Sequence, residues 1–239
     1  MIAQPTLTIR VLPTVILLQE RSEMAKGSRG SYPKGIAKRK EILDAALHII
    51  SVDGFNHTTL AKISQAVNIS EAGVLHYFHS LDDLLVEVLK ERDIQDMVNF
   101  GKTEVPSVDM FDEEIDKDWN PVRVISTITK KNMLTPGLVE LYAHMSVKAS
   151  DHGGPAYAYF NERGEFERQL VGHLVDRYAE VHESRPTVSS EHVARIMQAI
   201  LDGLQIQWLI DNSLDMEELA SEAFDMLSVS LKSGKITEG

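Results

Sequence analysis

The sequence of 239 residues contains no cysteine, and its longest apolar run near the N-terminus, residues 15–18, is far too short to cross a membrane. Without cysteine, neither a disulfide nor a thiolate metal site can form, which agrees with a reducing cytoplasm. The same run lacks the basic flank and the cleavage site of a signal peptide. We therefore expect a soluble, cytoplasmic protein without a membrane partner.

Signatures of catalysis are missing as well. The sequence has no G-x-S-x-G, no Walker loop, no G-x-G-x-x-G fingerprint and no H-E-x-x-H. Most of the nine histidines are scattered without the spacing of zinc ligands, and the pair His76 and His79 does not by itself indicate a metal site. We expect no enzyme, no cofactor and no bound metal.

Strands are not predicted either, because no useful stretch alternates apolar and polar residues, whereas apolar residues recur at helical spacing from Ile36 onward. A hydrophobic fraction of 43% is ample for a sizeable core. The sequence therefore predicts an all-α fold. Beyond an acidic, proline-containing loop, the expected helices lie at about 121–133, 136–150, 155–182, 190–211 and 215–232.

The charge is unevenly distributed along the chain. Residues 1–80 hold nine Lys/Arg and six Asp/Glu, a net charge of +3, whereas residues 81–239 hold fifteen and thirty, a net charge of −15. The basic charge of residues 1–80 and the acidic charge of residues 81–239 suggest that only residues 1–80 meet an anionic partner. Chance fluctuation is an alternative explanation of the charge difference. Residues 1–33 show no period and are expected to form a mobile leader; Met24 is a second plausible start, so residues 1–23 need not belong to the native product.

Two short helices joined by a tight turn are predicted between residues 58 and 80. Thr58 or Thr59 can cap the first helix, and Ser70 can cap the second. Asn68, between them, tolerates the left-handed backbone of a tight turn. Packed on the longer helix that precedes them, these helices would form a helix-turn-helix, whose second helix can enter a major groove.

The second of these helices, which begins after Ser70, has the residues that a DNA-reading helix needs. Its start is small and polar, so that its backbone can approach DNA, while Val74 and Phe78 can face the core. His76, Tyr77, His79 and Ser80 then offer hydrogen-bond donors to phosphates. The candidate DNA-binding residues are Lys38, Thr58, Thr59, Ser70, Glu71, Ala72, Gly73, His76, Tyr77, His79 and Ser80.

Segment 36–90 resembles the DNA-binding domain of the tetracycline-repressor (TetR) family. The matching features are a long first helix ending in DGF, then TTLAKISQAV, a turn, SEAGVLHYF, and SLDDLL at the start of a connecting helix. The resemblance implies a three-helix helix-turn-helix DNA-binding domain at 34–80, a connecting helix at 81–101, and a larger helical ligand-binding and dimerisation domain at 102–239.

Glu71 departs from this resemblance, because the family often has a basic residue at that position. One interpretation is that Glu71 stabilises the start of its helix through the helix dipole. The other is that its carboxylate accepts a hydrogen bond from cytosine N4 in the major groove.

The resemblance also implies a cavity for a small molecule among the middle helices and a homodimer through the last two helices. An ordinary intramolecular core is the alternative for both sets of residues. The candidate effector-binding residues are Met133, Leu141, Tyr142, His144, Met145, Phe166, Leu170, His173 and Trp208. The candidate dimer residues are Ile196, Ile200, Gly203, Leu204, Trp208, Leu219, Ala223 and Leu227.

Taken together, the motifs and the resemblance imply a ligand-responsive transcriptional regulator. We expect a repressor that binds a palindromic operator in double-stranded DNA as a homodimer and is released by a small-molecule effector. The alternative is an α-helical small-molecule-binding protein or enzyme with a vestigial helix-turn-helix. Its support is the acidic total charge and Leu81, which stands where the family frequently has a phosphate-binding lysine.

Overall fold

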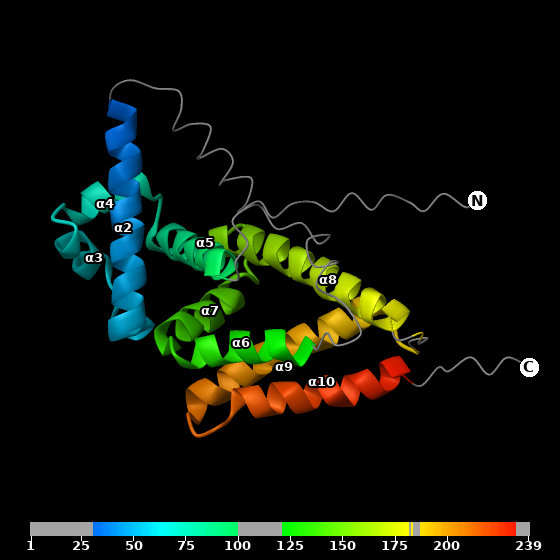
Figure 1. The fold of residues 1–239 in the computed structure, drawn as a ribbon. Coiled ribbons are helices and arrows are strands. Elements are labelled where there is room, and N and C mark those ends of the chain that lie inside the picture. Colours follow the sequence, from blue (N-terminus) through cyan, green and yellow to red (C-terminus); the bar gives the residue numbers. More distant parts are fainter. Residues whose placement is uncertain (1–30, 100–120, 182, 184–186, 233–239) are drawn as a thin grey trace, which may run out of the picture.

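A computed structural model describes residues 31–99, 121–181, 183 and 187–232 of the chain. All regular elements in these ranges are helical, which confirms the predicted fold class. In chain order they are α2 (Ser31–Asp53), η1 (Phe55–His57), α3 (Leu60–Ala66), α4 (Glu71–Tyr77), α5 (Leu81–Asn99), α6 (Pro121–Met133), α7 (Pro136–Lys148), α8 (Pro155–Val181), α9 (Ser190–Ile210) and α10 (Met216–Lys232) (Figure 1).

The predicted helix boundaries agree with the structure to within two residues from α6 onward. The expected leader extended to residue 33, whereas α2 already begins at Ser31. The rest of that leader and the expected loop at about 102–120 lie outside the described residues.

The head of the molecule consists of α2, η1, α3, α4 and the start of α5. One face of α2, with Ile42, Ala46 and Ile50 fully buried, packs against the apolar residues of the short helices and of α5. Two backbone positions bend the chain: Gly54 ends α2 with a φ of 85°, and Asn68, as the sequence predicts, lies between α3 and α4 with a φ of 52°. Positive φ is easy for glycine and tolerable for asparagine.

The body is built from α6 and α8 to α10, with α7 between the body and the head. Helix α9 contacts α8 along one side and α10 along the other, and α6 lies between α7 and α10 (Figure 1). Two apolar clusters hold these helices together. One centres on Val175, Met197 and Phe224, and the other on Leu204 and Trp208.

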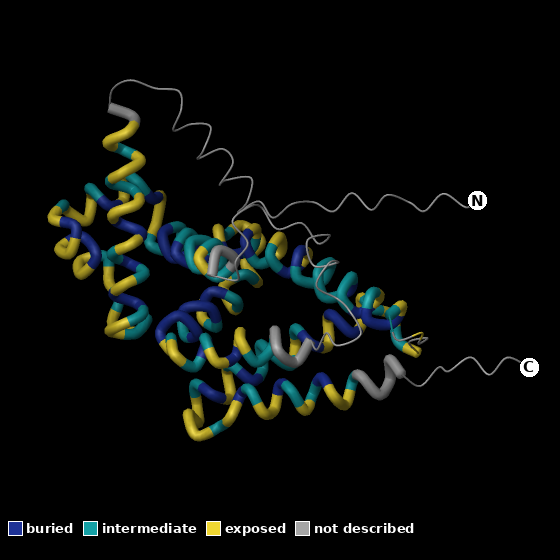
Figure 2. The backbone as a smooth tube through the Cα atoms, viewed as in Figure 1, coloured by how far each residue is buried: buried dark blue, intermediate teal, exposed yellow. Residues whose placement is uncertain are grey.

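Helix α7 joins the head to the body through a continuous core. Its residues Leu138, Leu141 and Met145 belong to the same buried cluster as the α2 and α5 side chains, and the N-terminal half of α7 is coloured mostly as buried in Figure 2. The Glu140 carboxylate accepts a hydrogen bond from the backbone N–H of Phe55 at 3.2 Å. A displacement of α7 must therefore act on the end of α2 and on η1.

Candidate nucleic-acid interface and effector site

Helix α4 is held by two buried side chains and a capped start. The Ser70 hydroxyl accepts a hydrogen bond from the Gly73 N–H at 3.0 Å, while Val74 and Phe78 are fully buried against α2, α3 and α5. Glu71, Ala72, Leu75 and His76 are exposed. A helix of seven residues is too short to persist alone, so tertiary packing fixes its orientation and leaves one face free for a partner.

Several candidate DNA-binding hydroxyls hold the backbone of the head. Thr59 caps α3 by accepting from the Lys62 N–H at 3.2 Å, and Ser80 accepts from the Asp83 N–H at 3.0 Å. The Thr58 hydroxyl donates to the Gly54 carbonyl at 3.0 Å. The predicted caps at Thr59 and Ser70 are thus present, and a hydroxyl that accepts from a backbone N–H keeps its own proton available as a donor.

The remaining DNA-binding candidates differ in exposure. His79 is almost fully exposed, whereas Tyr77 is half-buried and its ring meets that of His76 edge-on, with the ring centres 5.4 Å apart. Glu71 has no side-chain partner among the residues that the structure describes, so its role as a base contact stays a prediction. Lys38 donates to the Val67 carbonyl at 3.2 Å, in the turn that leads to α4.

We expect Ser70→Ala to lower the free energy of unfolding by about 1 kcal/mol, because the Gly73 N–H loses its side-chain acceptor. Ser70→Asp keeps an acceptor at the same position and should retain most of the stability. Urea unfolding followed by circular dichroism measures both changes. Equal stability of the wild-type protein and the alanine variant would show that the cap contributes nothing.

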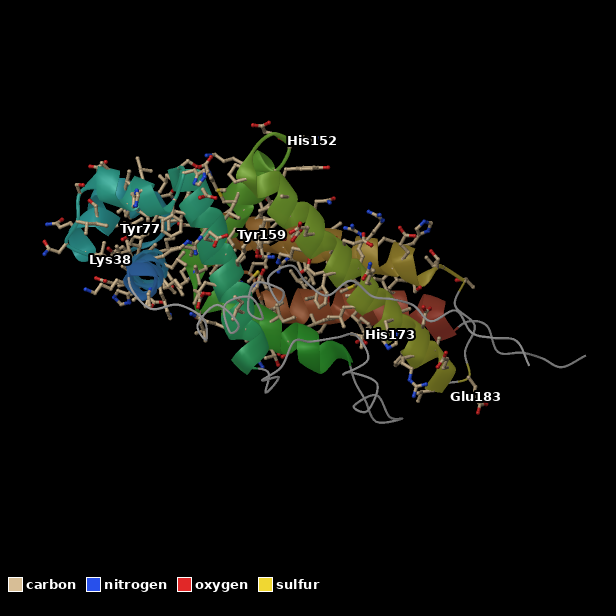
Figure 3. All side chains as sticks on the ribbon, turned by 90° about the horizontal axis from the view of Figure 1, so that it is seen from above. Lys38, Tyr77, His152, Tyr159, His173 and Glu183 are labelled. Carbon is tan, nitrogen blue, oxygen red and sulfur yellow. The ribbon has the colours of Figure 1, made fainter. Side chains whose placement is uncertain are left out.

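A polar cluster lies where α5, α7, α8 and α9 meet. The Arg163 guanidinium pairs with Asp93 at 3.3 Å and with Glu167 at 2.6 Å, and its Nη1 donates to the Tyr142 hydroxyl at 3.3 Å. Tyr142 in turn donates to the Asp202 carboxylate at 3.1 Å. Tyr159 donates to Asp93 at 2.7 Å, and it lies on α8 in the middle of the molecule (Figure 3).

Burial changes the protonation of this cluster. It raises the pKa of Glu167 in spite of the neighbouring Arg163, and it raises the pKa of Asp202 although the Tyr142 hydroxyl donates to that carboxylate. Burial also raises the pKa of the Tyr142 phenol above its usual range, so the tyrosine remains a hydrogen-bond donor. For Arg163, burial alone would lower the pKa, but Glu167 and Asp93 hold it well above the usual value.

The candidate effector-binding residues do not gather at one place. Tyr142 belongs to the polar cluster, Leu141 and Met145 are fully buried in the core shared with the head, and Trp208 and Met133 pack with the second body cluster. The others are distributed along α7 and α8: His144 is exposed and contacts the Phe55 ring, Phe166 is buried, and Leu170 and His173 are half-buried. Their binding role stays a prediction.

The candidate dimer residues also separate into two groups. Leu204 and Trp208 are buried within one chain, where they pack with Val139, Met216 and Ala220. Ile196 and Leu219 are exposed to 42% and 38%. The remaining candidates, Ile200, Gly203, Ala223 and Leu227, are half-buried.

The head is the part of the chain that is most similar in sequence to known proteins. The family described as bacterial regulatory proteins of the tetR family matches residues 42–88, which run from the core of α2 through α3 and α4 into α5. The head of the chain therefore resembles TetR-family regulators. The regulator RutR of Escherichia coli (strain K12) is 40% identical over 55 residues, which are 23% of this chain and 26% of RutR. The chain thus matches only about a quarter of the length of that relative.

Similarity to other proteins extends into the body. The nicotine-responsive transcriptional repressor HdnoR of Paenarthrobacter nicotinovorans is 24% identical over 184 residues, covering 74% of this chain and 87% of HdnoR. Among solved structures, a TetR transcription regulator from Haloarcula marismortui has a TM-score of 0.57 at 21% identity and covers 82% of this chain and 96% of its own. E. coli NemR in its reduced form has a TM-score of 0.55 at 14% identity, with coverages of 80% and 97%. These structures share the TetR fold.

Sequence reasoning missed four charged residues of the polar cluster. Asp93, Arg163 and Glu167 occur in helices that are rich in charge, where a solvent-exposed position is the simplest expectation. Asp202 is the charged residue in a largely apolar part of α9, and nothing nearby in the sequence indicates its partners. No spacing rule links them, since they come from three helices that only the tertiary fold brings together. Among the described residues there is no group of three or more His, Asp or Glu arranged to hold a metal ion, and no helix long and apolar enough to span a membrane.

The stability contribution of Asp202 should depend on pH. Because burial raises the pKa of Asp202, the native state binds the proton more tightly than the unfolded state. The contribution of this carboxyl group to the stability of the wild type therefore falls as pH rises from about 4 through the folded-state pKa. Asp202→Asn keeps an oxygen that accepts from Tyr142 and carries no charge. We therefore expect the stability of this variant, relative to the wild type, to increase between pH 4 and 7 in urea titrations. A pH-independent difference would contradict the assigned environment.

Proposed function

We propose that this chain is a ligand-responsive DNA-binding transcriptional regulator of the TetR family without catalytic activity. The single observation that supports this most is the geometry of α4: Val74 and Phe78 anchor it in the core, while its first turn is exposed and built from small and polar residues. Such a helix can lie in a major groove with its N-terminal residues at the base edges. The match of residues 42–88 to a family of bacterial regulatory proteins supports the same function.

We propose further that the protein is a repressor that a small molecule releases from DNA. HdnoR, which is similar over 184 residues, is named as a nicotine-responsive repressor, and this supports a small-molecule response for the present chain. The polar cluster around Arg163 is a suitable place for the effector, because Tyr142 connects it directly to α7. A ligand that exchanges hydrogen bonds with Tyr142 or Asp202 would favour one position of α7 over another.

Helix α7 contacts both the polar cluster and the DNA-binding head, so a movement of α7 would connect the two. On α7, Tyr142 contacts Asp202 and Arg163. Two residues earlier, the Glu140 carboxylate accepts a hydrogen bond from the N–H of Phe55, the first residue of η1. At the other end of α7, Lys148 pairs with Asp82 in the first turn of α5 at 2.6 Å. An effector that shifts α7 would therefore change the orientation of α4 relative to the body, and affinity for DNA and for the effector would be coupled reciprocally.

DNA binding is tested by selection from random double-stranded DNA, followed by fluorescence anisotropy with the enriched sequence. We expect a palindromic site and expect Leu75→Glu, at an exposed position of α4, to abolish binding without changing the melting temperature. Leu134→Glu, at an exposed position between α6 and α7, is the control and should bind normally. Failure of the wild type to enrich any sequence would contradict the proposal. Native mass spectrometry of the purified protein would reveal a co-purified effector.

A homodimer would explain a palindromic site, and exposed apolar residues on α9 and α10 are suitable for it. Ile206, Ile210 and Met226 are exposed to 49%, 83% and 75%, and Ile196 and Leu219 lie on the same two helices. Gly203 leaves open space beside α9, so a partner helix could approach closely there. We propose these residues, rather than the internally packed Leu204 and Trp208, as the centre of the interface.

We expect Ile206→Glu to weaken dimerisation about tenfold or more, because a carboxylate would be buried without a partner. Sedimentation velocity at micromolar concentration measures the monomer fraction. Val147→Glu, which introduces the same charge at a 72% exposed position on α7, serves as the control and should leave the association unchanged. Equal dimer strength in the Ile206 variant and the wild type would exclude this face.

A further inference from the structure

Helix α4 presents a solvent face without the side chains that commonly read purines. Its exposed residues are Glu71, Ala72, Leu75 and His76. Arginine and lysine are the usual readers of guanine, and asparagine and glutamine are the usual readers of adenine. None of these four residue types occurs in α4, which the structure describes along its whole length. The base contacts of this helix are therefore expected at pyrimidines.

Glu71 and Leu75 lie on one stripe of this exposed face. They are four positions apart, so their side chains are neighbours about 6 Å apart along the helix axis. Val74 and Phe78, which are fully buried, hold a different side of the helix in the core of the head. Helices α3 and α4 lie at one end of the molecule, on the side of α2 away from the body, where a duplex could approach (Figure 1). Because successive bases are about 3.4 Å apart, the two side chains can face base pairs one or two steps apart.

Leu75 brings an apolar group to this face, where its side chain is 41% exposed. A methyl group packed against a leucine removes apolar surface of both from water, which is favourable. The major groove presents one such group, the C5-methyl of thymine, and apolar side chains contact it. The chemistry of Leu75 therefore favours thymine.

Glu71 brings a group that, when ionised, only accepts hydrogen bonds. Cytosine offers the N4 amino group as a donor in the major groove, and acidic side chains accept from it. Guanine offers the acceptors N7 and O6, thymine offers the acceptor O4, and the adenine amino group lies beside the acceptor N7. These acceptors would repel a carboxylate. Glu71 therefore favours cytosine both by attraction to its amino group and by repulsion from the other bases.

We propose that α4 determines operator specificity through pyrimidines, with Leu75 packed against a thymine methyl group and Glu71 bonded to a cytosine amino group one or two base pairs away. This inference rests on the proposed DNA-binding function and deepens it, because it assigns the chemistry of two base contacts. Each half of the palindromic operator should then contain a thymine and a cytosine within two steps of each other.

The thymine contact is tested on the operator that the full-length wild-type chain selects. Each thymine of one half-site is replaced in turn by deoxyuridine, which lacks the C5-methyl group and pairs in the same way. Wild-type affinity, measured by fluorescence anisotropy, should fall about fourfold at one position, the effect of losing one buried methyl group. Leu75→Ala should bind the thymine and uracil forms equally. Leu134→Ala, at an exposed position outside the head, is the control and should discriminate as the wild type does.

The cytosine contact is tested by binding-site selection with variants of Glu71. Glu71→Ala should accept any base at one symmetric pair of positions and keep its other preferences. Glu71→Gln should change the preferred base at that position to adenine, because an amide can pair with both N6 and N7 of adenine. Glu191→Ala, which removes a carboxylate from the first turn of α9, is the control and should select the wild-type operator. Circular dichroism verifies that all variants are folded.

The inference is overturned if no deoxyuridine replacement weakens wild-type binding, or if Leu75→Ala discriminates between thymine and uracil as the wild type does. Selection of the same motif by the wild type and Glu71→Ala would also overturn it. In each of these cases the wild type binds its selected site, so the proposed function stands. A wild type that enriches no sequence would overturn both proposals, and the two failures are therefore distinguishable.

Discussion

Gly137→Ala is expected to lower the free energy of unfolding by about 3 kcal/mol, the upper part of the usual range for overpacking. A β-carbon at this position would lie 2.9 Å from the Gly54 Cα and 3.1 Å from the Ile50 carbonyl carbon, and closer still to the carbonyl oxygen. Each of these is a backbone atom, so no side-chain rotation can relieve the overlap. Helix α7 would have to move away from the end of α2.

The stability effect is measured by urea unfolding, and a loss of this size corresponds to a decrease of roughly 6–12 °C in the melting temperature of a chain of this length. Gly35→Ala is the matched control, because a β-carbon there meets nothing within 4 Å. An alanine in that helix should leave stability unchanged or raise it by up to about 1 kcal/mol. A Gly137 variant as stable as the Gly35 variant would mean that α7 and α2 are not in close contact.

The same substitution should also disturb the link between effector and DNA. When α7 moves from the end of α2, Glu140 loses its contact with the Phe55 N–H, which now lies at 3.2 Å. At temperatures where the Gly137→Ala variant is folded, DNA binding should therefore respond less to an effector than in the wild type. Anisotropy titrations with and without the identified effector would measure this coupling.

Arg163→Met is expected to cost about 3–5 kcal/mol, the usual effect of removing one partner of a buried ion pair. The side chain of Arg163 is only 24% exposed, and it is the partner of both Asp93 and Glu167. Methionine fills much of the volume but leaves both carboxylates without this cation. Arg195→Met on α9 is the control, since Arg195 forms an exposed pair with Glu191 that should contribute less than about 1 kcal/mol.

The loss at Arg163 should also depend on pH. Burial already raises the pKa of Glu167, and without the neighbouring guanidinium it rises further, so this carboxyl group prefers its neutral form more strongly in the native state. Protonation removes the penalty, and the stability difference between the wild type and Arg163→Met should shrink as pH is lowered from 7 to 4. A difference that stays constant over this range would show that the variant loses packing rather than charge compensation.

The DNA-binding head could be predicted largely from sequence because its decisive features are local. A cap requires a hydroxyl three residues from a backbone N–H, as at Ser70 and Gly73, and a tight turn requires a residue that tolerates positive φ, as at Asn68. The spacing of Val74 and Phe78 likewise determines which face of a seven-residue helix can be buried. Each rule concerns neighbours within about one turn of helix.

Only the tertiary structure determined the features that depend on distant partners. Arg39 could have met a phosphate, but the fold pairs it with Glu87, 48 residues away. Trp208 could have belonged to a dimer interface, but within one chain it is buried beside Met216 and Ala220.

The polar cluster and the close contact at Gly137 have the same origin. Asp93, Arg163 and Asp202 come from three helices. Position 137 requires glycine because the backbone of Ile50 leaves no space for a β-carbon there. The amino-acid sequence by itself determined the all-α fold and the helix-turn-helix, because helical period, caps and turns are set by nearby residues. The pairing of charges and the space beside a glycine were decided by the packing of helices that are far apart in the chain.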